Sequence, residues 1–147
     1  MDERRIKETA PCGISCYTCS AYKNGVIKEC ACTLSKSLEG FDKFAEKFSS
    51  MNPELSNFEE FKNVLSHFSS GNCEGCRNRL EDVPYCAIPS CIREKGIEFC
   101  SECKEFPCTK SGLFGELKDT WLKNTRKMKE LGKEEYLYEI EAEPHYK

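Results

Sequence analysis

Cysteine is the residue type whose number and spacing in this chain could do chemistry. Twelve of the 147 residues are cysteines, and ten of them fall into short clusters. Thiols a few residues apart can reach one ion without spanning a long loop, as they do in tetrahedral zinc and iron–sulfur sites. Metal binding is therefore predicted for Cys12, Cys16, Cys19, Cys73, Cys76, Cys86, Cys91, Cys100, Cys103 and Cys108, with Cys30 and Cys32 as possible further ligands.

The thiols can be grouped into sites in more than one way. The most self-contained four-ligand set, with nine residues between its inner pair, is Cys73, Cys76, Cys86 and Cys91. Two trios remain, Cys12 with Cys16 and Cys19, and Cys100 with Cys103 and Cys108. Cys30 and Cys32 could complete both trios, or the N-terminal thiols could fold back onto the C-terminal trio. Two or three ions per chain are expected.

The expected ligand chemistry favours a structural metal. His67 lies away from any cysteine and His145 lies in a terminal tail, so all-cysteine sites are expected. Such sites suit structural zinc or iron–sulfur clusters, whereas hydrolytic zinc uses histidine or carboxylate ligands and keeps a position open for water. No Ser-His-Asp set, Walker loop or dinucleotide fingerprint is present, so no catalytic residue is predicted. Zinc is the first hypothesis.

Three alternatives follow from the same cysteines. An iron–sulfur or thiol-redox protein is the main one, with Cys30 and Cys32 as the best candidates for free thiols. The spacing Cys12-x3-Cys16-x2-Cys19 is that of radical-SAM enzymes, but their large α/β barrel does not fit this length. Disulfides would need an oxidising compartment, and the charged N-terminus has no apolar segment of a secretory signal.

Composition limits the partners and the location. The net charge of −3 does not favour nucleic acid, and no run of 18 apolar residues could span a membrane. A cytoplasmic protein that presents a surface to a protein partner is expected. The basic residues between Lys118 and Lys129 are interpreted as one solvated helix face.

The apolar pattern predicts a mainly α-helical fold, a small single domain over residues 1–147 with an irregular, metal-stapled region of zinc-knuckle-like loops. Residues 10–33 hold the N-terminal cysteine cluster and are expected to be irregular. Residues 35–71 form a helical pair, the first helix running from about residue 35 to residue 51, and phenylalanines of the two helices are expected to meet. Ser56 and Glu59 have the spacing of a capping box. Residues 72–110 form the cysteine-rich region, with one short helix from Ser90 to Gly96. Residues 111–141 form the C-terminal helices, with a break at Gly132.

Three segments resemble a prokaryotic cysteine-rich family described as a domain of unknown function, of the 3795 type. They are Cys12–Cys19 followed by Ala21 and Tyr22, then Cys73–Cys76 with the Cys86–Cys91 segment, and finally Arg93–Cys108. The tail from Met128 to Leu137 is also similar to the helical end of such proteins. The resemblance implies a metal-binding, cytosolic protein with ten family cysteines, and it implies no reaction.

Overall fold

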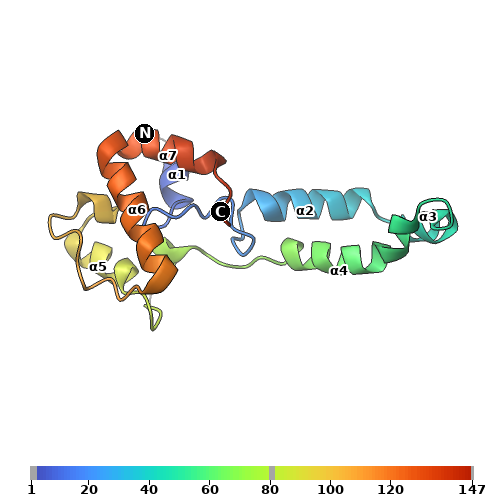
Figure 1. The fold of residues 1–147 in the computed structure, drawn as a ribbon, viewed down its shortest axis with the longest axis horizontal. Coiled ribbons are helices and arrows are strands. Elements are labelled where there is room, and N and C mark those ends of the chain that lie inside the picture. The colour runs from blue at the N-terminus through green and yellow to red at the C-terminus, as the bar shows by residue number, and fades with distance from the viewer. Residues whose placement is uncertain (1–2, 80–81, 147) are drawn as a thin grey trace. The chain divides into compact units, whose positions relative to one another are not determined.

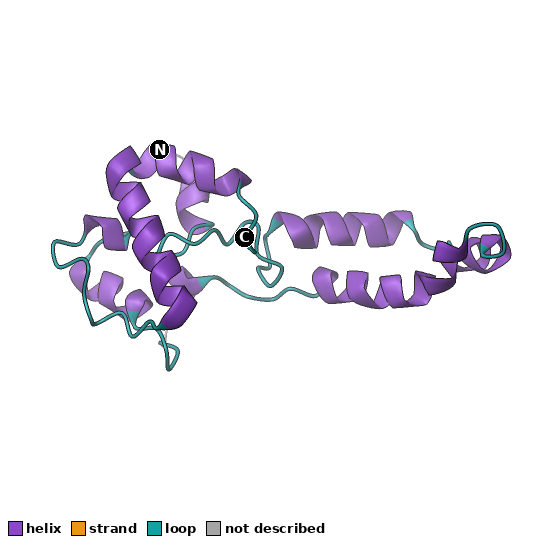
Figure 2. Cartoon of the chain, viewed as in Figure 1, coloured by secondary structure: helices purple, strands orange, loops and turns teal. Residues whose placement is uncertain are grey.

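The fold is mainly helical, as predicted, in a computed structural model that describes residues 3–79 and 82–146. These residues form seven α-helices and three short 3-10 helices, and only isolated β-bridges occur among them (Figures 1 and 2). An α/β barrel of the radical-SAM kind is therefore absent from this part of the chain. None of its helices is long and apolar enough to cross a membrane.

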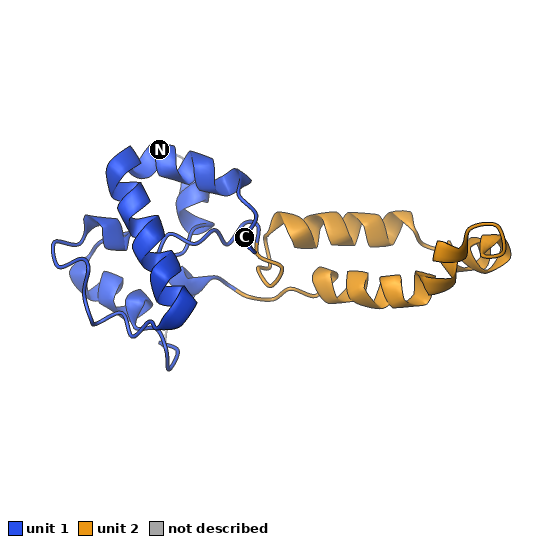
Figure 3. Cartoon of the chain, in the orientation of Figure 1, with its two compact units in different colours: residues 1–18, 74–147 blue, residues 19–73 orange. Residues whose placement is uncertain are grey.

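The chain divides into two compact units, coloured separately in Figure 3. Unit 1 comprises residues 1–18 and 74–147, and unit 2 comprises residues 19–73. Unit 2 is therefore inserted in the sequence of unit 1.

Unit 2 is a helical hairpin. Helices α2 (Val26–Ser37) and α4 (Phe58–Ser69) pack side by side, and α3 (Asp42–Phe48) with the 3-10 helix η1 (Pro53–Asn57) joins them (Figure 1). The single helix expected from residue 35 to 51 was wrong: the chain turns between α2 and α3, where Gly40 has a φ of +80°. Helix α2 also takes up part of the segment expected to be irregular. One helix was expected because the helical spacing of the aromatic residues after Leu38 continues across the turn.

Only some of the phenylalanines of unit 2 pack together, and others are exposed. The ring centroids of Phe41 and Phe58 lie 5.1 Å apart, but Phe44 is 57% exposed and Phe61 is 42% exposed. The buried apolar side chains of α2, α3 and α4 are small or few, namely Ala31, Ala45 and Leu65. The capping box was also wrong, because Ser56 donates its hydroxyl to the Pro53 carbonyl instead.

Unit 1 holds the larger core. It contains α1 (Glu3–Lys7), η2 (Cys76–Asn78), α5 (Ile88–Lys95), η3 (Cys100–Glu102), α6 (Gly115–Leu131) and α7 (Lys133–Ala142). One apolar cluster joins η3, α6 and α7 through Phe99, Met128, Tyr136, Leu137 and Ile140. A second cluster joins α5 and α6 through Ile88, Ile92 and Trp121, with several cysteines packed against it.

The helix ends in unit 1 follow the predicted punctuation. Helix α5 has Pro89 in its first turn and ends at Gly96, which has the left-handed conformation at φ +61°. Gly132 separates α6 from α7 as expected, with φ +85°. Near the C-terminus, the His145 ring nitrogen Nδ1 lies 2.7 Å from the Ser15 carbonyl oxygen.

Candidate metal centre

Four cysteines line one small cavity in unit 1. Cys91, Cys100, Cys103 and Cys108 surround a space of about 20 Å³ whose other walls are almost entirely hydrocarbon, from α5, α6 and Phe106. Besides burial, negative charge on Cys91, Cys103 or Cys108 raises the pKa of Cys100, and charge on Cys103 or Cys108 raises that of Cys91, as expected of neighbouring thiols. We call this group the four-thiol cavity.

Local structure explains how these four residues come together. Cys91 lies on α5, and Cys100 begins η3, where its amide donates to the Pro11 carbonyl oxygen at 3.0 Å. The Cys103 amide donates to the Cys100 carbonyl oxygen at 3.1 Å, which closes a tight turn. This turn brings two thiols of a Cys-x2-Cys pair to the same side, and Gly96 reverses the chain so that α5 lies beside them.

Three further cysteines line a second cavity of unit 1, of about 170 Å³. They are Cys12, Cys76 and Cys86, which we call the three-thiol group. The backbone amide of Ile14 stabilises the Cys12 thiolate, and the amide of Ile88 stabilises the Cys86 thiolate. In both cases the amide lies two residues after the cysteine. This is the amide-to-thiolate geometry expected of knuckle-like turns, and Gly75 at φ +83° allows the bend before Cys76.

The structure divides the set that looked most self-contained in the sequence. Cys91 belongs to the four-thiol cavity, while Cys76 and Cys86 belong to the three-thiol group. The reason is the start of α5 between Cys86 and Cys91. Once the helix begins at Ile88, each residue rotates the side-chain direction by about 100°, so the two thiols face different cavities.

Burial raises the pKa of several of these thiols. The pKa of Cys100 rises to about 11, mainly through desolvation and also through its thiol neighbours, although the Trp121 indole partly opposes the rise. Desolvation also raises the pKa values of Cys12, Cys86 and Cys91. Nucleophilic and redox-active cysteines need the opposite shift, because the thiolate is the reactive form.

Five cysteines remain. Cys16 lies in unit 1, where its amide donates to the Glu8 carbonyl oxygen at 2.7 Å. In unit 2, the Cys73 amide donates to the Ala21 carbonyl oxygen at 2.8 Å and the Lys23 amide donates to the Cys73 carbonyl oxygen at 3.0 Å, which brings Cys73 toward the segment that begins at Cys19. Cys30 and Cys32 lie on α2 instead. Two positions along a helix rotate a side chain by about 200°, so these two thiols do not face each other.

The four thiols lie in one cavity, but their sulfur atoms are not arranged around a single point. In the part of the chain that the structure describes, no group of three or more His, Cys, Asp or Glu stands close enough to hold a metal ion. A cysteine sulfur moves by rotation about one bond, among three staggered positions. The backbone therefore decides which thiols can converge, and here it gathers four in one cavity and three in another.

Two side chains that lie beside the cysteines were not predicted as site residues. Trp121 was expected only as part of a helix stripe, yet it lines the four-thiol cavity. Arg77 follows Cys76 and donates from Nε to the carbonyl oxygens of Ile6 and Thr9, at 2.8 and 2.9 Å. Neither role has a sequence signal, because both depend on residues that are distant in the chain.

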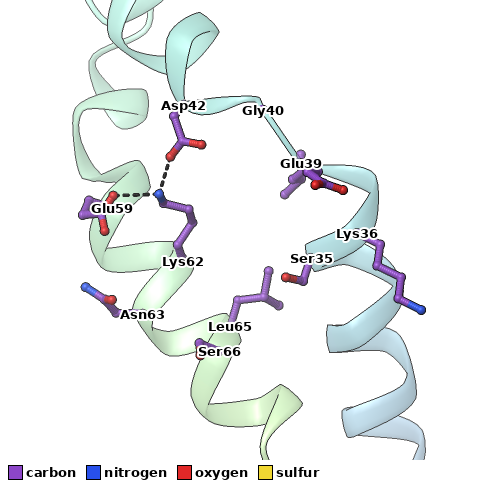
Figure 4. A pocket seen from close by; sticks show the side chains of 11 residues that line it. Ser35, Lys36, Glu39, Gly40, Asp42, Glu59, Lys62, Asn63, Leu65 and Ser66 are labelled. Atoms are coloured by element: carbon purple, nitrogen blue, oxygen red, sulfur yellow. Dashed lines mark hydrogen bonds and ion pairs between the residues drawn. The ribbon is translucent and has the colours of Figure 1, made fainter.

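A cavity in unit 2 is lined by charged and polar side chains in place of thiols. It measures about 480 Å³ and lies between the end of α2 and the start of α4 (Figure 4). Its central cation, Lys62, forms ion pairs with Asp42 and Glu59, and the Lys62 to Glu59 distance is 2.8 Å. No cysteine lines this cavity, so its chemistry is separate from that of the thiols.

The family of the chain follows from the cysteine-bearing region. A family model described as a protein of unknown function, DUF3795, matches residues 8–112, more than half of the chain. The chain belongs to this family. The matched region contains all twelve cysteines, and it ends before α6 and α7 begin. No curated protein and no solved structure matches the chain. The resemblance inferred from the cysteine motifs is thus confirmed.

Proposed function

We propose that this DUF3795 protein binds zinc through its clustered cysteines and that the metal stabilises the fold. The observation that carries the proposal is the four-thiol cavity, in which Cys91, Cys100, Cys103 and Cys108 surround one small space. Four thiolates would form a closed tetrahedral site, as in structural zinc proteins. The residues fit the ion by chemistry and by number.

The size of the cavity favours a single ion over an iron–sulfur cluster. A space of about 20 Å³ accommodates one particle the size of a water molecule, for which about 10–15 Å³ is needed. Zinc in such a site lies about 2.3 Å from each sulfur. A four-iron cluster has eight heavy atoms and would require the apolar walls from α5 and α6 to move apart. Iron–sulfur or thiol-redox chemistry is the alternative that the metal analysis below distinguishes.

The proposed role of the metal is structural because the surrounding core is thin. The apolar cluster that joins α5 to α6 has three buried members, Ile88, Ile92 and Trp121, and cysteines of both groups, among them Cys100 and Cys108, pack against it. Structural zinc contributes about 10–16 kcal/mol of apparent binding energy at neutral pH, which becomes folding energy when the site exists only in the folded state. A reducing compartment, the cytoplasm, would keep these thiols available as ligands.

Metal content per chain tests the proposal directly. Protein purified anaerobically without added metal is expected to contain two or three zinc ions by mass spectrometry. Cys103→Ser is expected to lose one of them, while Cys30→Ser retains all of them as the matched control. Iron in place of zinc, or equal zinc content in all three proteins, would overturn the assignment of the four-thiol cavity.

The consequence for stability needs a second measurement. Removal of metal by a strong chelator is expected to abolish the cooperative thermal transition of the helical circular dichroism signal, and added zinc is expected to restore it. An unchanged melting temperature after complete metal removal would contradict a structural role even if zinc is bound.

We further propose that the metal-stabilised protein acts as an interaction module for a protein partner. The support is the hydrocarbon exposed on the hairpin, where Leu34 is 43% exposed, Phe61 42% and Val64 54%. Phe61 and Val64 are three positions apart on α4, so at 100° per residue they lie on one side of that helix, while Leu34 lies on α2. A photo-crosslinker near these side chains should yield a cross-linked species that Val64→Glu abolishes and Ser66→Glu retains. Equal yields from both variants would contradict the assignment.

A further inference from the structure

The indole N–H of Trp121 is a buried donor without an acceptor. Trp121 is 1% exposed, and its Nε1 atom makes no hydrogen bond that meets ordinary distance and angle limits among the residues described. Nearly all buried polar groups in proteins are hydrogen-bonded, and leaving one unpaired costs about 1–3 kcal/mol. A buried N–H without a partner therefore indicates that the functional protein supplies a hydrogen-bond acceptor at this place.

The place of Trp121 identifies that acceptor. Its ring lines the four-thiol cavity from α6, and it faces Phe106 edge-on at 5.2 Å between ring centroids. Cys100 lines the same cavity and packs against the apolar cluster that contains Trp121. The indole is also the side-chain hydrogen-bond donor that would favour a Cys100 thiolate. Ile88 and Ile92 of α5 also line the cavity and accept no hydrogen bond, and the remaining polar side chain of the lining, Ser111, makes no hydrogen bond to the indole that meets ordinary limits.

We propose that the Trp121 indole N–H donates a hydrogen bond to the Cys100 sulfur when that sulfur is a metal-bound thiolate. The inference rests on the proposed zinc function and deepens it. A neutral buried thiol is a weak acceptor, whereas a thiolate carries negative charge and attracts an N–H strongly. Zinc binding would thus satisfy the orphan donor and spread part of the charge of the thiolate group onto the indole.

Trp121 is then a positioning residue that acts through Cys100. Groups that hydrogen-bond to metal ligands fix the direction of the ligand and typically change metal affinity by about 10–100-fold when removed. Trp121 lies outside the region matched by the family model, which ends at residue 112. The proposed bond therefore couples α6 to a site formed by the family region, and metal loading would order this helix.

A nuclear magnetic resonance experiment on the unmodified full-length protein tests the bond. Trp121 is the single tryptophan of the chain, so a ¹⁵N-labelled sample gives one indole signal. Addition of zinc is expected to move the indole proton downfield and to slow its exchange with water. With ¹¹³Cd in place of zinc, the indole proton is expected to show a coupling to the metal through the shared sulfur. Metal uptake with neither the shift nor the coupling would overturn the inference and leave zinc binding intact.

A pair of variants provides an independent readout. Trp121→Phe removes the N–H, while Phe106→Leu alters the packing of the same cavity and keeps the N–H. Trp121→Phe is expected to weaken zinc about tenfold or more and to shift the sulfur-to-metal charge-transfer band of the cobalt-loaded protein to longer wavelength. Phe106→Leu is expected to leave the band in place. Identical bands in all three proteins would overturn the inference, and absence of cobalt and zinc uptake in the unmodified protein would overturn the proposed function itself.

Discussion

The Tyr136 hydroxyl donates a hydrogen bond to the Gly13 carbonyl oxygen at 2.6 Å, across 123 positions of sequence. Tyr136 is completely buried, so this bond is shielded from water. Gly13 follows Cys12 directly, and Asn124 on α6 also approaches the Gly13 carbonyl, at 3.4 Å. The C-terminal helices therefore fix the backbone next to a cysteine of the three-thiol group.

Loss of the Tyr136 hydroxyl should destabilise unit 1. Tyr136→Phe keeps the ring and removes the donor to Gly13, which is expected to lower the free energy of unfolding by about 1–3 kcal/mol. Tyr138→Phe is the matched control, because Tyr138 is 65% exposed. Urea unfolding of the metal-loaded proteins gives both values. Equal stabilities for the two variants would show that the buried bond contributes nothing measurable.

Glycine is required at position 13 for two separate reasons. Its φ is +88°, and an added Cβ would lie 2.9 Å from Asn124 Cβ and 3.1 Å from the Tyr136 hydroxyl oxygen. Gly132 has nearly the same φ, +85°, but an added Cβ there meets nothing within 4 Å.

Comparison of two alanine variants separates these two reasons. Gly132→Ala is expected to cost about 1 kcal/mol from backbone strain alone, and Gly13→Ala is expected to cost clearly more because of the added contact. Thermal unfolding of both variants measures the difference. If the two melting temperatures fall equally, the close packing around Gly13 is not limiting.

Arg77 should be irreplaceable by lysine. Its Nε donates to the carbonyl oxygens of Ile6 and Thr9, its Nη1 donates to the Glu98 carbonyl oxygen at 2.9 Å, and its guanidinium lies 4.4 Å from the Phe99 ring centroid. A lysine ammonium cannot span three carbonyls and stack on a ring at once.

Arg77→Lys is therefore expected to lower the free energy of unfolding by about 2–4 kcal/mol. Arg126→Lys, at an exposed position of α6, is expected to be neutral. Chemical denaturation at fixed zinc concentration compares them, and a loss of less than half a kcal/mol for Arg77→Lys would contradict the structural role given to its guanidinium.

An ion pair between α1 and α7 gives a pH dependence with a definite sign. Hydrogen bonds from Arg5 and then Arg4 lower the pKa of the Glu141 carboxyl below its ordinary value of 4.5, and Arg5 Nε lies 2.6 Å from Glu141 Oε2. A lowered folded-state pKa contributes stability that is fully present above the ordinary carboxyl pKa. This contribution is lost as the pH falls through the lowered value.

Glu141→Gln is expected to cost about 1 kcal/mol, with the same difference from the unmodified protein at every pH from 6 to 8. Direct titration of the Glu141 side-chain carbon by nuclear magnetic resonance should give a midpoint below that of an ordinary glutamate. A midpoint at or above the ordinary value would contradict the ion pair.

The two helical cysteines should differ in accessibility. Cys30 is exposed on α2, while Cys32 is partly buried and its thiol lies 3.8 Å from the Ser69 carbonyl oxygen. In the zinc-loaded protein, alkylation is expected to modify Cys30 first, without release of metal. Mass spectrometry of peptides at increasing times locates the modification. Equal rates at Cys30 and Cys103 would contradict both the exposure of Cys30 and the ligand role of Cys103.

The sequence by itself determined the helical class of this protein and which residues are candidate metal ligands. Closely spaced cysteines identify a metal-binding candidate because ligand spacing along the chain is a local property. The ends of α5 and α6, at Gly96 and Gly132, could also be predicted, since a positive φ at a helix end selects glycine locally. The family resemblance came from the same local motifs and was confirmed by the match over residues 8–112.

Only the tertiary structure decided which thiols share a cavity. Cys91 joins Cys100, Cys103 and Cys108 because α5 turns it away from Cys86, and this rotation depends on where the helix begins. The burial of Trp121 beside Cys100 likewise depends on how α6 packs against residues some twenty positions earlier in the chain. Spacing in the sequence determines which thiols are candidate ligands. The packing of the helices determines which of these thiols share a cavity and places the Trp121 indole N–H beside them.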